Sequence, residues 1–164
     1  MLTLRCTAKL LKRLKVRAEP SPPPSSTELG DWYANLLYVE RQQLIVYVSE
    51  VTLLPVLLRA RGDEPLAVRL ASALGPMLAA LGVPDDVVRR ELEEMKDVTF
   101  AATANRTVLG SMNDFTNMID GYWEPHATLH EIALKVADAP CGPLEMDDPK
   151  STTIELLARG RRRG

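Results

Sequence analysis

"DWYANLLYVERQQLIVYVSE", residues 31–50, has the composition of two strands joined by a turn. Both halves are rich in Tyr, Val, Leu and Ile, which favour strands, and the polar centre at Glu40–Gln43 suits a turn. The pattern predicts a β-hairpin with strands at about 32–39 and 43–49.

The first strand of this hairpin is apolar on both sides. Trp32 and Leu36 fall on one face, and Tyr33 and Leu37 fall on the other. A strand that is apolar on both faces is buried on both faces, so we expect it to be central in its sheet.

The rest of the chain alternates between strand and helix patterns. Alternation of period two predicts short strands at 2–6 and 98–103. The run 51–60 is either an edge strand or irregular, because Pro55 cannot donate to a central ladder. Helical patterns occur in the other segments, which are about 8–16, 64–81, 84–95, 107–121, 125–136 and 152–159. Pro76 is expected to kink or split the second of these helices near Leu74.

These elements predict an α+β fold. We expect a small mixed or antiparallel sheet of about four strands, including the hairpin 32–49, packed against five or six helices. The proline-rich segment "EPSPPPSS" at 19–26 is expected to be a surface loop. The chain of 164 residues suits one domain. We place it at 1–140, with a loop, a short helix and a basic tail appended at 141–164.

Charge and cysteine content narrow the class of protein. The net charge is −2, yet residues 1–17 and 159–164 hold ten of the twenty basic residues and no acid. Such ends either are solvated or make weak, non-specific contact with nucleic acid. Cys6 and Cys141 form no metal or redox spacing, and no apolar run approaches the roughly 18 residues that cross a bilayer. We expect reduced thiols, no membrane contact and a cytoplasmic protein.

Polar residues gather where the helix at about 107–121 begins. Asn105 can cap its first turn, and Ser111 with Asp114 has the spacing of a capping box, although it lies inside the apolar run. The residues expected in the core recur at steps of three and four, and they are Val108, Leu109, Met112, Phe115, Ile119 and Tyr122. The opposite side collects Arg106, Gly110, Asn113 and Asn117. This side is either solvated or the surface of a pocket or partner site.

Known catalytic and metal patterns do not fit this region. A nucleotidyltransferase needs two carboxylates on a strand after Gly-Ser, whereas Gly110-Ser111 is followed by a helical pattern. His126 and His130 are four residues apart and could share a metal, but no Glu stands beside the first and no third ligand is evident. We therefore expect no metal, no cofactor and no catalytic residue.

Three blocks of the chain resemble a family of small bacterial proteins of unknown function. The blocks are "RCTAKLLKRL", "LGDWYANLLYVERQQLIVYVS" and "ANRTVLGSMNDFTNMID", with Thr107 where the family usually has Ser. The resemblance implies no activity that could be carried over. It implies that Trp32, Asn35, Asn105, Arg106 and Asn113 belong to recurring motifs.

The function expected from these observations is recognition. The candidate recognition patch consists of Trp32, Asn35, Asn105, Arg106, Ser111, Asn113 and Asp114. We expect a non-enzymatic interaction or accessory protein that binds another protein or itself. The alternative is a small enzyme acting on a nucleotide or other anionic substrate, with Arg106 holding the anion and Asp114 as acid or base. A convergent pocket with perturbed carboxylates favours the enzyme, and a flat, solvated patch favours recognition.

Overall fold

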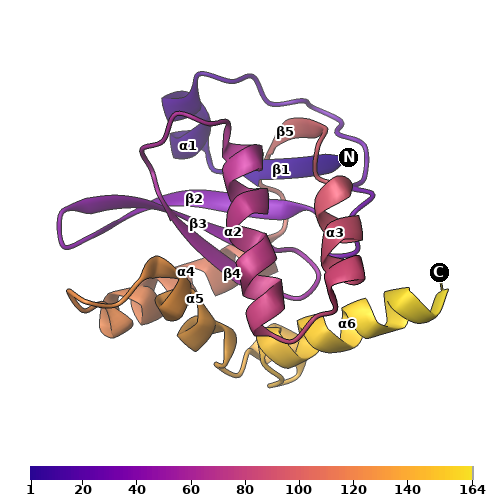
Figure 1. The fold of residues 1–164 in the computed structure, drawn as a ribbon. Helices are drawn as coiled ribbons and strands as arrows, with labels where there is room; N and C mark the ends of the chain where they lie inside the picture. Colours follow the sequence, from indigo (N-terminus) through magenta and orange to yellow (C-terminus); the bar gives the residue numbers. More distant parts are fainter. Residues whose placement is uncertain (164) are drawn as a thin grey trace.

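A five-stranded mixed sheet forms the centre of the fold, in the order β4-β3-β2-β1-β5 (Figure 1). The computed structural model describes the backbone of residues 1–163 and the side chains of residues 1–160. The strands are β1 (Leu2–Cys6), β2 (Trp32–Val39), β3 (Gln42–Ser49), β4 (Pro55–Arg59) and β5 (Val98–Ala102). The helices are α1 (Ala8–Leu14), α2 (Leu66–Ala80), α3 (Asp85–Glu93), α4 (Arg106–Tyr122), α5 (Leu129–Ala137), the 3-10 turn η1 (Gly142–Leu144) and α6 (Pro149–Arg163).

The predicted hairpin is confirmed. β2 and β3 pair antiparallel, and a two-residue turn, Glu40–Arg41, joins them. Both turn residues have positive φ, 48° and 67°, as a type I′ turn requires. β1 pairs parallel with β2 on the other side, so β2 is central as expected.

The sheet has five strands where about four were expected. Of the two alternatives for the segment around Pro55, the edge strand is confirmed as β4, whereas the expected split of the helix at Pro76 was wrong. Pro55 is the first residue of β4, a position where the missing N–H is tolerated. α2 runs unbroken through Pro76, which lies on the exposed side of the helix. The buried stripe of Leu70, Leu74 and Met77 holds α2 on the sheet despite the lost hydrogen bond.

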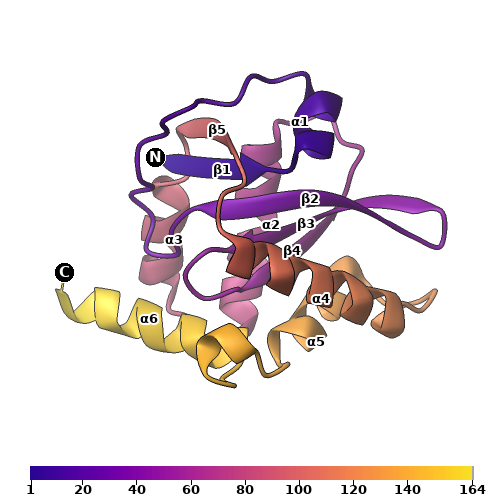
Figure 2. The same cartoon turned by 180° about the vertical axis from the view of Figure 1, so that it is seen from behind.

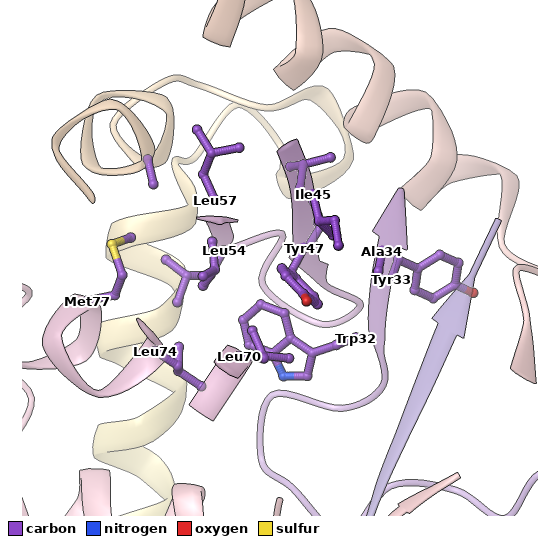
Figure 3. Packing of buried hydrophobic residues seen from close by; sticks show 14 of the residues in the cluster. Trp32, Tyr33, Ala34, Ile45, Tyr47, Leu54, Leu57, Leu70, Leu74 and Met77 are labelled. Carbon is purple, nitrogen blue, oxygen red and sulfur yellow. The ribbon is translucent and has the colours of Figure 1, made fainter. Parts of the chain in front are cut away.

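Helices cover both faces of the sheet. α2 crosses one face in Figure 1, and α4 lies on the other face in the reverse view of Figure 2. α5 packs along the edge strand β4 and contacts both α2 and α4. In Figure 3, Trp32 and Tyr47 lie against Leu70 of α2, whereas Tyr33 points away on the opposite side of β2. Because successive strand residues alternate between faces, β2 contributes to both halves of the core.

α4 packs on the sheet through the predicted apolar positions, with one exception. Val108, Met112, Phe115 and Ile119 are buried. Tyr122 was predicted to be a core residue, but its side chain is 39% exposed. It lies in the last turn of α4, where its ring faces Lys135 of α5 at 5.8 Å from Nζ to the ring centre.

α5 begins four residues later than expected. The Thr128 side chain accepts a hydrogen bond from the Glu131 N–H, and the Glu131 carboxylate accepts one from the Thr128 N–H. This capping box starts the helix at Leu129. His126 therefore lies outside α5 and His130 inside it, so the two imidazoles do not share a helix face.

The segment after residue 140 ends in α6, which packs on the rest of the chain. Thr153 and Leu157 are buried, and the Thr153 hydroxyl donates to Thr52 Oγ1 at 2.9 Å. The side chains of the predicted basic tail beyond residue 160 lie outside the described residues.

Candidate functional site

The start of α4 is tied to β2 by its cap. As predicted, Asn105 caps the helix, since its Oδ1 accepts from the N–H groups of Thr107 (2.9 Å) and Val108 (3.2 Å). The Asn105 N–H in turn donates to the Tyr33 hydroxyl at 3.0 Å. The predicted capping pair Ser111–Asp114 has no such role, because α4 already begins at Arg106 and both residues lie in its interior.

The residues of the candidate recognition patch do not lie on one surface. Trp32 is fully buried under α2 (Figure 3), because its face of β2 is the face that α2 covers. Ser111 is buried on the sheet side of α4. Asn35 is half-buried, and its Oδ1 accepts a hydrogen bond from the Thr7 hydroxyl at 2.7 Å. Trp32 and Ser111 are therefore core residues and not part of a surface patch.

The remaining patch residues lie on the outer side of α4. Arg106, Gly110, Asn113 and Asn117 are all exposed, and we call this stripe the α4 polar face. Asn105 and Asp114 are exposed beside it. Within the described residues, the side chains of Arg106, Asn113 and Asn117 make no hydrogen bond or ion pair. The face is a convex helix surface whose polar groups are free to bind water or a partner.

Gly110 has no evident structural role within this chain. A Cβ built at Gly110 meets no atom within 4 Å, so no neighbour demands the absence of a side chain. Its φ also lies outside the left-handed region that favours glycine. An exposed glycine inside a helix costs about 0.8–1 kcal/mol relative to alanine. Nothing inside the described molecule offsets that cost.

An ion pair between Arg5 and Asp31 links two of the quoted motifs, and sequence reasoning missed it. Arg5 Nε lies 2.8 Å from Asp31 Oδ2, with side chains 20% and 10% exposed. Arg5 also donates to the Ala102 carbonyl at 2.9 Å, and the Ser25 hydroxyl donates to Asp31 Oδ1 at 2.6 Å. The sequence held one signal for this pair: a basic residue near the end of one apolar strand and an acidic residue directly before another. The pair joins β1, β5 and the start of β2, so its role here is structural.

A second buried charge lies on α3. Glu91 is 3% exposed, and its carboxylate accepts from the N–H groups of Glu28 (3.0 Å) and Leu29 (3.1 Å). Burial raises the pKa of Glu91, and the two N–H groups oppose that rise. Glu91 lines a cavity of about 260 Å³ between α3 and the end of α6. The Glu91 carboxylate is thus already engaged in holding the loop before β2.

The described part of the chain holds no group of three or more His, Cys, Asp or Glu side chains arranged to bind a metal ion. None of its helices is both long enough and apolar enough to span a bilayer.

Comparison with known proteins places nearly the whole chain in one family. Residues 3–152 match the family model described as "Domain of unknown function (DUF6933)". No curated protein and no solved structure matches the chain significantly. The matched region runs from β1 into the first turn of α6, and it contains the hairpin, the Arg5–Asp31 pair and α4. The chain therefore belongs to the DUF6933 family, a domain of unknown function.

Proposed function

We propose that this protein is a non-enzymatic interaction protein that binds another protein through the α4 polar face. The observation that carries the proposal is Gly110, which weakens α4 without relieving any contact inside the described chain. A glycine on an outer helix surface allows another backbone to approach closely. Asn113 and Asn117, one and two turns beyond it, offer donors and acceptors that make no bond to a described residue.

The alternative, an enzyme acting on a nucleotide or another anionic substrate, has less support. Arg106 and Asp114, the expected anion holder and acid or base, are both exposed on a convex helix. The cavities at α3 and at the hairpin tip are lined by other residues. Electrostatic catalysis needs preorganised groups in a water-excluded site, and an exposed helix face does not provide one.

The proposed setting is the cytoplasm. Cys6 and Cys141 are both free and buried, which suits a compartment that keeps thiols reduced. At the basic N-terminal segment, Arg5 is engaged by Asp31 and Arg13 donates to Gln43, whereas Lys9 and Lys12 are exposed. We expect only weak, salt-sensitive contact with nucleic acid there. A gel-shift titration that finds tight binding above physiological salt contradicts this expectation.

Site-specific photocrosslinking tests the interaction. A benzophenone amino acid replaces Asn117 on the α4 polar face in cells that produce the full chain, and the same probe replaces Val68 on α2 as the control position. Val68 is 47% exposed and lies on the helix that covers the other face of the sheet. We expect a discrete adduct from position 117 and none from position 68. An adduct of twice the 18.2 kDa chain mass identifies a second copy as the partner.

A second variant separates a specific surface from chance proximity. Gly110→Gln adds bulk to the α4 polar face while keeping good helix propensity, so it should abolish the adduct without unfolding the chain. Ser72→Gln makes a comparable change on the exposed side of α2 and should leave the adduct unchanged. Equal amounts of adduct in the chain without a further substitution, in Gly110→Gln and in Ser72→Gln contradict the proposal. Turnover of a nucleotide that is lost in Arg106→Ala favours the enzyme instead.

A further inference from the structure

A cleft at the hairpin tip lies apart from the α4 polar face. The turn between β2 and β3 and the connection between α4 and α5 lie at the same end of the molecule in Figures 1 and 2. Between them is a cavity of about 810 Å³, which is within the range of small-molecule sites. Pro125 lies in the lining of this cleft, and it keeps α4 from continuing because the residue before a proline, here Glu124, avoids the helical region. The helix ends one residue earlier, where Trp123 is extended, with φ −62° and ψ 129°.

The lining of the cleft combines one aromatic ring with two carboxylates. Trp123 is half-buried, and Pro125 and Leu129 add apolar wall. Glu40 from the hairpin turn and Glu124 from the helix connection supply negative charge, and both are exposed. A tryptophan face with carboxylates nearby is the environment that attracts a cation.

Arg59 is the basic residue of this lining. Its guanidinium donates to the Gln42 side-chain oxygen, so part of its donor capacity is used within the β3–β4 edge. With one basic and two acidic residues, the lining has a net negative charge. The charge balance favours a cationic ligand over an anionic one.

A cation–π contact inside the chain lies next to the cleft. Lys135 already lies over the Tyr122 ring at 5.8 Å. Among the described residues, no cationic side chain lies over the next aromatic ring, that of Trp123. Trp123 also packs against the core, so only the part of its side chain that lines the cleft is open to a cation from outside the chain.

We propose that the Trp123 cleft binds a guanidinium or ammonium group, with the cation over the Trp123 ring and its charge balanced by Glu40 and Glu124. The group comes either from an arginine or lysine side chain of a peptide or from a free small amine, and the chemistry of recognition is the same. This inference does not rest on the α4 polar face. It names a different site with its own ligand class.

The two tryptophans provide the readout. In a ¹H–¹⁵N spectrum the chain gives two indole N–H signals, one from Trp123 in the cleft and one from fully buried Trp32. Trp32 serves as the internal control, and Trp123→Phe assigns the signals. The probes are N-acetyl-arginine-N-methylamide for a peptide side chain, agmatine for a free amine, and N-acetyl-glutamate-N-methylamide as the anionic control.

The expected result is a saturable shift of the Trp123 signal with either cationic probe and no movement of the Trp32 signal. Glu40→Gln and Glu124→Gln should each weaken binding about 2–5-fold, the change expected for a cation–π or charge contact at an exposed site. Arg59→Gln should strengthen binding of the cation. Whichever cationic probe binds more tightly identifies the source of the group.

Three results overturn the inference. They are no saturable shift with either cation, tighter binding of the anionic probe, and cation binding that is unchanged in the Glu40→Gln, Glu124→Gln double variant. Both glutamates are exposed, so these variants should fold, and the Trp32 signal reports whether they do.

Discussion

Replacing Gly110 by alanine should make the protein more stable. Position 110 is an exposed interior position of the 17-residue helix α4, and the new Cβ would meet no atom within 4 Å. The change therefore keeps every contact and removes the entropic penalty of glycine, which in a helix interior is about 0.8–1 kcal/mol. We expect the free energy of unfolding to rise by about 0.5–1 kcal/mol and the midpoint temperature by roughly 2–4 °C for a domain of this size. Urea denaturation followed by circular dichroism at 222 nm measures both the midpoint and its slope.

Gly82→Ala is the matched control for this prediction. A Cβ at Gly82 also meets nothing within 4 Å, but Gly82 has φ +83°, in the region that L-residues avoid. The two positions thus differ in backbone conformation and not in space. We expect Gly82→Ala to lower stability by about 1–2 kcal/mol. If Gly110→Ala destabilises the purified chain, the α4 polar face already contacts something, such as a second copy, and the reasoning about its free surface fails.

Four other substitutions test the core, the α4 polar face and the buried charges. Phe115→Ala should lower the free energy of unfolding by about 3–5 kcal/mol, because Phe115 is buried between α4 and the sheet. Arg106→Ala should lower it by about 0.5 kcal/mol or less, because Arg106 is exposed. Equal losses for the two variants in urea denaturation would show that Arg106 belongs to a structural network. Asp31→Asn should lower the free energy of unfolding by about 1.5–3 kcal/mol, because Arg5 keeps its charge and loses the partner carboxylate. A free energy of unfolding within about 0.5 kcal/mol of wild type, measured by urea denaturation, rules out a structural role for the pair. Burial raises the pKa of Glu91, so the folded chain keeps this proton to higher pH than the unfolded chain. The free energy of unfolding of wild type, relative to that of Glu91→Gln, should therefore fall as pH rises above 4.5. If this difference between the two proteins stays constant or rises with pH, the pKa of Glu91 is not raised in the folded chain.

Local patterns in the sequence determined the elements with strong periodicity. The hairpin 32–49 was predicted within one residue because its side chains alternate about a polar centre, and β2 was expected to be central because both its faces are apolar. The Asn105 cap and the buried stripe of α4 followed from residue type and spacing. These features depend on neighbours within a few residues, which the sequence displays directly.

The behaviour of the prolines depended on packing. The segment around Pro55 could be an edge strand or irregular, and only pairing with β3 made it an edge strand that begins at Pro55. Pro76 removes one hydrogen bond from α2, but the buried leucines on the same helix outweigh that loss. Burial against a segment that is distant in the sequence depends on the tertiary structure. The local rule that proline breaks a helix or a strand therefore did not decide what these segments form.

The features of the candidate site also divide into those that the sequence shows and those that depend on the tertiary structure. The sequence by itself determined that Arg106, Gly110 and Asn113 share one side of a helix, because that follows from 3.6 residues per turn. Only the tertiary structure decided that Trp32 lies in the core under α2, and that Arg5 and Asp31, 26 residues apart, form one ion pair. The Trp123 cleft also arose only when the hairpin tip met the connection after α4. Helical periodicity can be read along the chain, whereas contacts between distant segments exist only after the strands have paired and the helices have packed on them.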